Sequence, residues 1–69
     1  MKLSARNVFK GTIKSLEKGI ITASVKIDIG GGNTVTSIIT KESIDELGLK
    51  VGDKAYAIIK STEILIAKD

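Results

Sequence analysis

ITASVKIDIGGGNTVTSIIT, residues 21–40, carries the strongest structural signal in the 69-residue chain. Apolar and polar side chains alternate from residue 21 to residue 29, which predicts a strand that is buried on one face. The GGGN run at residues 30–33 supplies positions that tolerate a positive φ, and TVTSIIT then predicts a second strand. This segment is therefore predicted to form a β-hairpin, and it indicates an all-β fold.

The residues before this hairpin predict a further strand. Residues 5–16 are expected to be extended, with Gly11 marking a bulge or a tight bend of the kind that small barrels need at their corners. LEKG, residues 16–19, is expected to close the hairpin between this strand and the next. The first half of the chain therefore predicts three consecutive strands.

After residue 40 the periodicity changes to that of a helix. KESIDELG, residues 41–48, places Ile44 and Leu47 three residues apart and ends in a glycine, as a short helix does. Either Thr40 or Ser43 would cap this helix, and Ser43 with the glutamate three residues later also matches a capping box. A single short helix is therefore expected in the middle of a β protein.

Two more strands are predicted at residues 55–60 and 63–67, with the sequences AYAIIK and EILIA. The element order becomes β-β-β-α-β-β. Five short strands with a helix between the third and the fourth are typical of a five-stranded OB-like Greek-key barrel. We expect one such domain over residues 1–69.

The composition indicates that this domain does not stand alone. A chain this short buries only about 60% of its unfolded surface. Small scaffolds are stabilised by disulfides, by a metal or by oligomerisation. The chain has no Cys and no His, which excludes disulfides and removes the usual zinc ligands, while 42% of its residues are hydrophobic. We therefore expect a homo-oligomer with aliphatic side chains at its interfaces.

Composition also bears on function. Without His or Cys, the commonest general base and the best nucleophile are missing, so we do not expect an enzyme. The GGGN run joins two strands, so it predicts a turn and not a phosphate-binding loop. The first residues do not resemble a signal peptide, and no stretch approaches membrane-spanning length. We therefore expect a cytoplasmic protein with no membrane contact.

An OB-type module for single-stranded nucleic acid is one alternative. Such surfaces combine a basic groove with aromatic side chains on which bases stack. The net charge is +3, the lysines are scattered, and the only aromatic residues are Phe9 and Tyr56. We therefore expect no nucleic-acid partner, although this module and a pure assembly module remain the alternative interpretations.

A set of hydrogen-bond donors without metal-ligand character remains. Arg6 carries a rigid fork of donors that suits a tetrahedral oxyanion, and a second cation near it would match a dianion. Each member also has an ordinary explanation, as a helix cap, a surface lysine or one partner of an ion pair. The candidate oxyanion-binding residues are Ser4, Arg6, Thr40, Ser43, Lys60 and Ser61.

SARN at residues 4–7, TSIIT at residues 36–40 and IIKSTEILIA at residues 58–67 resemble the molybdate-binding Mop family, the molbindins. The same domain recurs as the transport-associated OB domain of molybdate transporter ATPases. The likeness covers essentially the whole chain. It implies an OB-like barrel that assembles into a hexamer, as a trimer of dimers, with molybdate or tungstate bound between subunits and with no organic cofactor.

The resemblance also implies how the site residues are shared between subunits. Ser4, Arg6, Lys60 and Ser61 would come from one subunit, and Thr40 and Ser43 would come from its neighbour. A second class of oxyanion site in the family would fall here near Lys18, Gly19 and Thr22. The implied function is reversible oxyanion binding for intracellular molybdenum storage or homeostasis.

Overall fold

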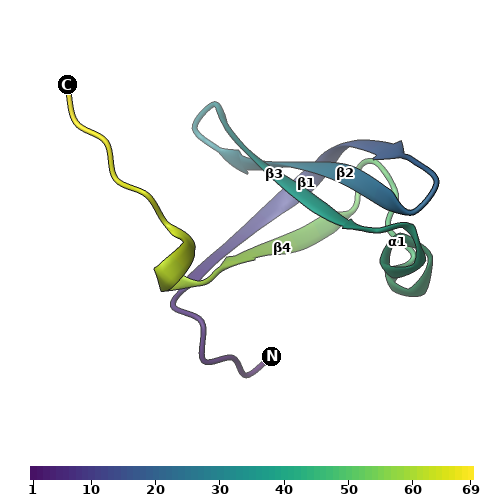
Figure 1. The fold of residues 1–69 in the computed structure, drawn as a ribbon, viewed down its shortest axis with the longest axis horizontal. Coiled ribbons are helices and arrows are strands. Elements are labelled where there is room, and N and C mark those ends of the chain that lie inside the picture. The colour runs from purple at the N-terminus through teal and green to yellow at the C-terminus, as the bar shows by residue number, and fades with distance from the viewer.

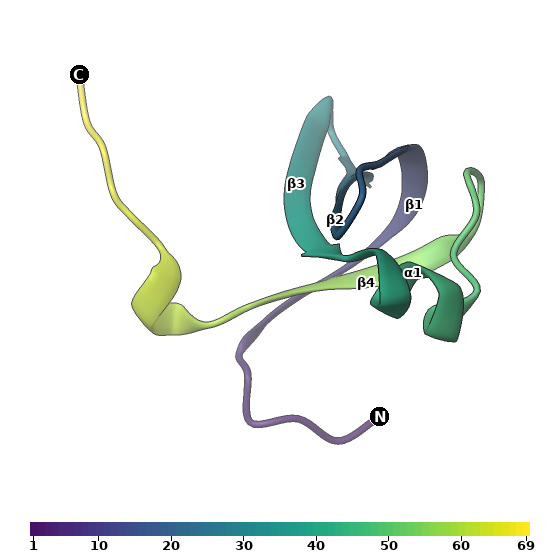
Figure 2. The same cartoon turned by 45° about the vertical axis from the view of Figure 1, so that its right-hand side comes forward.

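Four antiparallel strands form one curled sheet in the computed structural model, which describes residues 1–69 (Figures 1 and 2). The strand order is β3-β2-β1-β4, and every neighbouring pair is antiparallel. A short helix, α1, covers one end of the sheet (Figure 2). The elements are β1 (Asn7–Lys18), β2 (Thr22–Gly30), β3 (Asn33–Thr40), α1 (Lys41–Leu47) and β4 (Lys54–Ile59).

The predicted hairpin at residues 21–40 is confirmed as β2 and β3. Gly30, Gly31 and Gly32 have φ values of 94°, 62° and 78°, a region that favours glycine. The Asp28 carboxylate accepts a 2.9 Å hydrogen bond from the Gly30 amide, which holds the start of the turn. The glycine run therefore sets the register in which the two strands pair.

Strand β1 bends because it pairs with β2 along its second half and with β4 along its first half. Gly11 lies at this bend, and a Cβ atom there would overlap the Asp28 carbonyl oxygen and the Ile27 side chain. Of the two expectations for Gly11, a bulge or a tight bend, the structure has the bend, because the register shift falls between Ile13 and Ser15. Gly11 is required because the backbone of β1 lies close to that of β2 at this point. The extra residue of the bulge, which relieves the curvature, lies further along β1 between Ile13 and Ser15.

Helix α1 begins and ends as the sequence predicts. Thr40 is the N-cap, and its hydroxyl accepts the Ser43 amide at 3.1 Å, so the capping interaction is made by Thr40. Gly48 follows the last helical residue with φ 63° and ψ 37°, the left-handed conformation of a C-terminal glycine. Ile44 is 1% exposed and packs against the concave face of the sheet.

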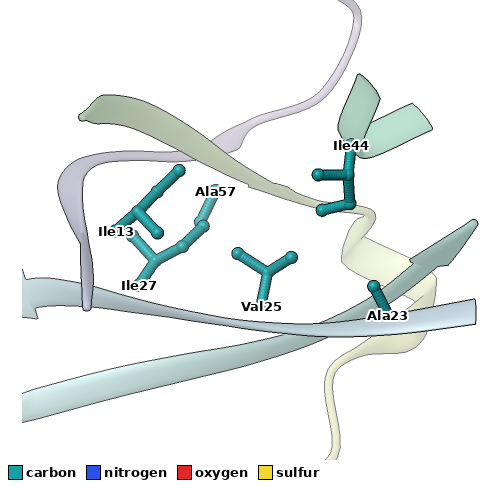
Figure 3. Close-up of a cluster of buried hydrophobic side chains, with 6 residues drawn as sticks. All are labelled: Ile13, Ala23, Val25, Ile27, Ile44 and Ala57. Atoms are coloured by element: carbon teal, nitrogen blue, oxygen red, sulfur yellow. The ribbon is translucent and has the colours of Figure 1, made fainter. Parts of the chain in front are cut away.

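The hydrophobic core is small and lies on the concave face (Figure 3). Many large apolar side chains remain exposed, among them Phe9 and Ile38 on the strands and Ile20 in the β1–β2 turn. The chain therefore has more apolar side chains than its small core can bury, as the composition predicts. The buried core residues are Ile13, Ala23, Val25, Ile27, Ile44 and Ala57.

The predicted fifth strand at residues 63–67 is wrong for the isolated chain. The chain leaves β4 through a 3-10 turn, η1 (Ser61–Glu63), and then runs extended without a strand partner. Leu65 and Ile66 are 94% and 93% exposed, and this C-terminal tail points away from the sheet (Figures 1 and 2). The fold is thus all-β with one short helix and four strands, and the outer edges of β3 and β4 stay unpaired. No helix has the length and apolar content needed to span a membrane.

Candidate functional site

The N-terminal segment and the η1 turn leave the sheet at the same end. Asn7, the first residue of β1, lies opposite Ile59, the last residue of β4. The Asn7 side-chain amide donates to the Ile59 carbonyl at 3.2 Å and to the Ser61 hydroxyl at 3.5 Å. The structure therefore brings one half of the predicted site to this end, namely Ser4, Arg6, Lys60 and Ser61.

The two cations of this half are free of carboxylates. The single ion pair of the chain joins Lys18 to Asp45 at 3.6 Å, so neither Arg6 nor Lys60 forms one. Both side chains are exposed, and Lys60 caps η1 without a side-chain hydrogen bond. The interpretation of Arg6 as half of an ion pair is therefore wrong within the chain, and two positive charges stand available at one end of the sheet.

Thr40 and Ser43 lie at the opposite end. Thr40 pairs with Thr22, and the Lys41 amide donates to the Ile21 carbonyl at 2.8 Å, which fixes the start of α1 to the β1–β2 turn. The Thr40 and Ser43 hydroxyl oxygens are 2.8 Å apart. The Ser43 amide is used by the cap, and the two hydroxyls bond each other, so at least one of their protons is already engaged within the chain.

The predicted site is therefore split within one chain. The contour of β1 from Asn7 to Lys18 is roughly 36 Å at the usual rise per residue. In Figure 1 helix α1 and the η1 turn accordingly lie at opposite sides of the molecule. Arg6 directly precedes the start of β1, whereas Thr40 pairs with Thr22 beyond its end, so the chain places the two residues at opposite ends of this strand.

The residues predicted for a second site lie around the β1–β2 turn. Lys18, Gly19 and Thr22 line a surface hollow of about 320 Å³. The Gly19 amide donates to the Thr22 carbonyl at 2.8 Å, and the Lys18 ammonium is engaged with Asp45. Within one chain this hollow thus offers an anion fewer free donors than the η1 end does.

Sequence reasoning assigned no role to Asn7, although the SARN motif contains it. The one sequence feature that could have indicated a role is its position directly after Arg6, at the start of a strand. Its partner Ser61 could not be predicted, because the two residues are 54 positions apart in the sequence. No group of acidic, Cys or His side chains is arranged to hold a metal ion. The arrangement is suited to accepting an anion through donors.

Comparisons with known proteins agree with this chemistry. The TOBE domain family model matches residues 3–66. Molybdenum-pterin-binding protein 1 of Clostridium pasteurianum is 52% identical over 66 residues, which cover 96% of this chain and 97% of the relative. The structure of a molybdate-binding protein from Sporomusa ovata matches with a TM-score of 0.91 at 37% identity, covering 99% of this chain and 100% of that one. The cytoplasmic molybdate-binding protein ModG, solved with molybdate bound, matches with a TM-score of 0.84 at 48% identity, over 88% of this chain and 43% of its own.

Proposed function

Because this chain belongs to the TOBE domain family, and within it to the molybdate-binding Mop proteins, we propose that it binds molybdate reversibly. The observation that supports this most is the pair of cations, Arg6 and Lys60, that stand without carboxylate partners at the end of the sheet where Asn7 contacts Ser61. Their two charges match the two charges of molybdate. Tungstate, which is nearly the same size, would bind in the same way.

The site would be completed by a second subunit. Thr40 and Ser43 lie at the far end of the sheet from Arg6, so the two halves can meet only when the helix end of one copy faces the η1 end of another. Arg6, Lys60, Ser4 and Ser61 would then come from one subunit, and the two hydroxyls from its neighbour. A hexamer built as a trimer of dimers would repeat this interface.

The C-terminal tail supports assembly as well. Both faces of residues 64–67 are apolar, a pattern found in strands that are buried on both faces. A mostly apolar hollow of about 370 Å³ lies between β3 and β4, lined in part by Val35 and Ile59. We propose that the tail of a second copy enters this gap and supplies the missing fifth strand, a low-cost route to a dimer.

Selectivity would follow from size and protonation. A site made almost wholly of donors disfavours phosphate, which is partly protonated near neutral pH and needs an acceptor. Sulfate is smaller than molybdate, so its oxygens would leave at least one buried donor unpaired, at a cost of about 1–3 kcal/mol. That cost corresponds to a preference for molybdate of roughly ten- to a hundredfold.

The biological role proposed here is storage or homeostasis of molybdenum in the cytoplasm, the compartment named for ModG. Residues 1–69 would act as one binding domain without catalysis, organic cofactor, membrane contact or nucleic-acid partner. A second, weaker oxyanion site would form where copies of Lys18, Gly19 and Thr22 meet.

Calorimetric titration of the purified protein with molybdate, tungstate and sulfate tests this function. Saturable binding of the first two, at least tenfold tighter than sulfate, is expected, together with a rise in the thermal midpoint as each binds the folded assembly. Native mass spectrometry that shows oligomers without any bound oxyanion would favour the pure assembly module. Salt-sensitive binding to single-stranded DNA would instead favour the nucleic-acid module.

A further inference from the structure

We propose that Asn7 is a positioning residue for the oxyanion site, which sets molybdate affinity by holding the Ser61 hydroxyl and the start of η1. This inference rests on the proposed function and adds a residue to it. Asn7 is partly buried, at the point where the N-terminal segment enters β1. It is the side chain that joins the Arg6 segment to the Ser61 turn.

The first contact of Asn7 fixes the end of β4. Its side-chain amide donates to the Ile59 carbonyl at 3.2 Å, within the ordinary range for such a bond. Ile59 directly precedes Lys60, so this bond holds the backbone at the point where the chain turns toward the proposed ligand.

The second contact sets the direction of a hydroxyl. The Ser61 oxygen is the acceptor for the Asn7 amide, so its own proton is left to be donated elsewhere. An oxyanion only accepts, and a hydroxyl that already accepts one bond is polarised to donate the next. The 3.5 Å separation is at the long limit for a hydrogen bond, so this contact is the one that can tighten when the ligand arrives.

The η1 turn has little else to hold it. Lys60 caps it without a side-chain hydrogen bond, and the bond that closes the turn runs from the Glu63 amide to the Lys60 carbonyl at 2.9 Å. The residues after Glu63 have no strand partner in the chain. Asn7 is therefore the one side chain that joins this turn to the sheet by a hydrogen bond.

A double-mutant cycle tests the coupling. Molybdate affinity is measured by calorimetry for the parent, Asn7→Ala, Ser61→Ala and the double variant. Asn7→Ala is expected to weaken binding about tenfold, and less than about threefold when Ser61 is already alanine. Asn7→Asp, which cannot donate and adds a negative charge, is expected to weaken binding by about a hundredfold. Asn33→Ala, the other asparagine of the chain, is the matched control at the start of β3 and should bind as the parent does.

A measurement without ligand separates this inference from the proposed function. In molybdate-free protein, amide hydrogen exchange at Glu63 is expected to be about fivefold faster in Asn7→Ala than in the parent, because the turn opens more often. Equal exchange rates would overturn the hold of Asn7 on η1, and fully multiplicative losses of affinity in the cycle would overturn its hold on the Ser61 hydroxyl. Either result would leave molybdate binding intact. A parent protein that takes up no molybdate would overturn the proposed function itself, and this role with it.

Discussion

Gly11 lies so close to the backbone carbonyl of Asp28 that no side chain larger than a hydrogen atom fits between them. This contact lets β1 bend between its two partner strands. Gly11→Ala is expected to destabilise the protein by about 3 kcal/mol, because backbone atoms cannot move aside as a flexible side chain can. Denaturant unfolding measures this. Gly48→Ala is the control, because a Cβ there would meet open space and only the left-handed backbone conformation opposes it. This substitution should lower the free energy of unfolding by about 1 kcal/mol, and a larger decrease at Gly48 than at Gly11 would contradict the role assigned to Gly11.

Charge at the η1 end should dominate oxyanion affinity. Arg6→Ala is expected to weaken molybdate binding by more than a hundredfold, since the dianion then keeps one counter-charge, and Ser61→Ala by about tenfold. Lys2→Ala, an exposed basic residue near the N-terminus, is the control for net charge. Calorimetry that gives Arg6→Ala the affinity of the parent would remove Arg6 from the site.

If each site is shared between two subunits, two inactive variants that lack different halves should restore binding when they are mixed. Arg6→Ala destroys one half of every site, and the double variant Thr40→Ala with Ser43→Ala destroys the other half. Mixed oligomers of the two variants are expected to contain some sites with both halves intact, so they should bind molybdate when neither variant does. Titration of the refolded mixture measures the recovery. Mixed oligomers that are seen by native mass spectrometry but still do not bind would show that both halves belong to one chain.

The tail should control assembly. Ile66→Asp places a charge in a strand proposed to be buried on both faces, so the assembled mass in light scattering is expected to fall. Lys68→Asp, two residues further along the tail, is the matched control for an added carboxylate and should leave the mass unchanged. An Ile66→Asp protein with the parental mass would exclude the tail from the interface.

Because the chain has no cysteine, disulfide crosslinking can test whether the tail of a second copy lies between β3 and β4. Val35→Cys is combined with Ile64→Cys, Leu65→Cys or Ile66→Cys in three separate variants, because Val35 lines the gap between β3 and β4. At least one variant is expected to form covalent dimers on mild oxidation. Disulfides that form only within a chain would instead mean that each tail closes its own barrel.

Local patterns in the sequence predicted most of the fold. The alternation at residues 21–40, the glycine run after it and Gly48 each act within a few residues, so the hairpin and the helix were predictable. The bulge after Ile13 was not, because it results from β1 pairing with two strands that are distant in sequence. The tail has the continuous apolar run of a strand that is buried on both faces, but this pattern does not say which chain supplies the partner strand.

The members of the candidate site stay a prediction. Donor chemistry and the motif pointed to Arg6 and Lys60, and the structure leaves both without a carboxylate. The resemblance already implies that Arg6 and Thr40 come from different subunits, and the placed strands give a physical reason, since the two residues lie at opposite ends of β1. The Asn7 contact with Ser61 is likewise a product of the β1–β4 register.

The unpaired C-terminal tail has a consequence for how much oxyanion a cell could hold. If two or more copies must meet before any site exists, the number of sites rises more steeply than the number of chains at low expression. Halving synthesis would then release more than half of the stored anion. Storage of the anion would in this way have a threshold that is set by the abundance of the protein.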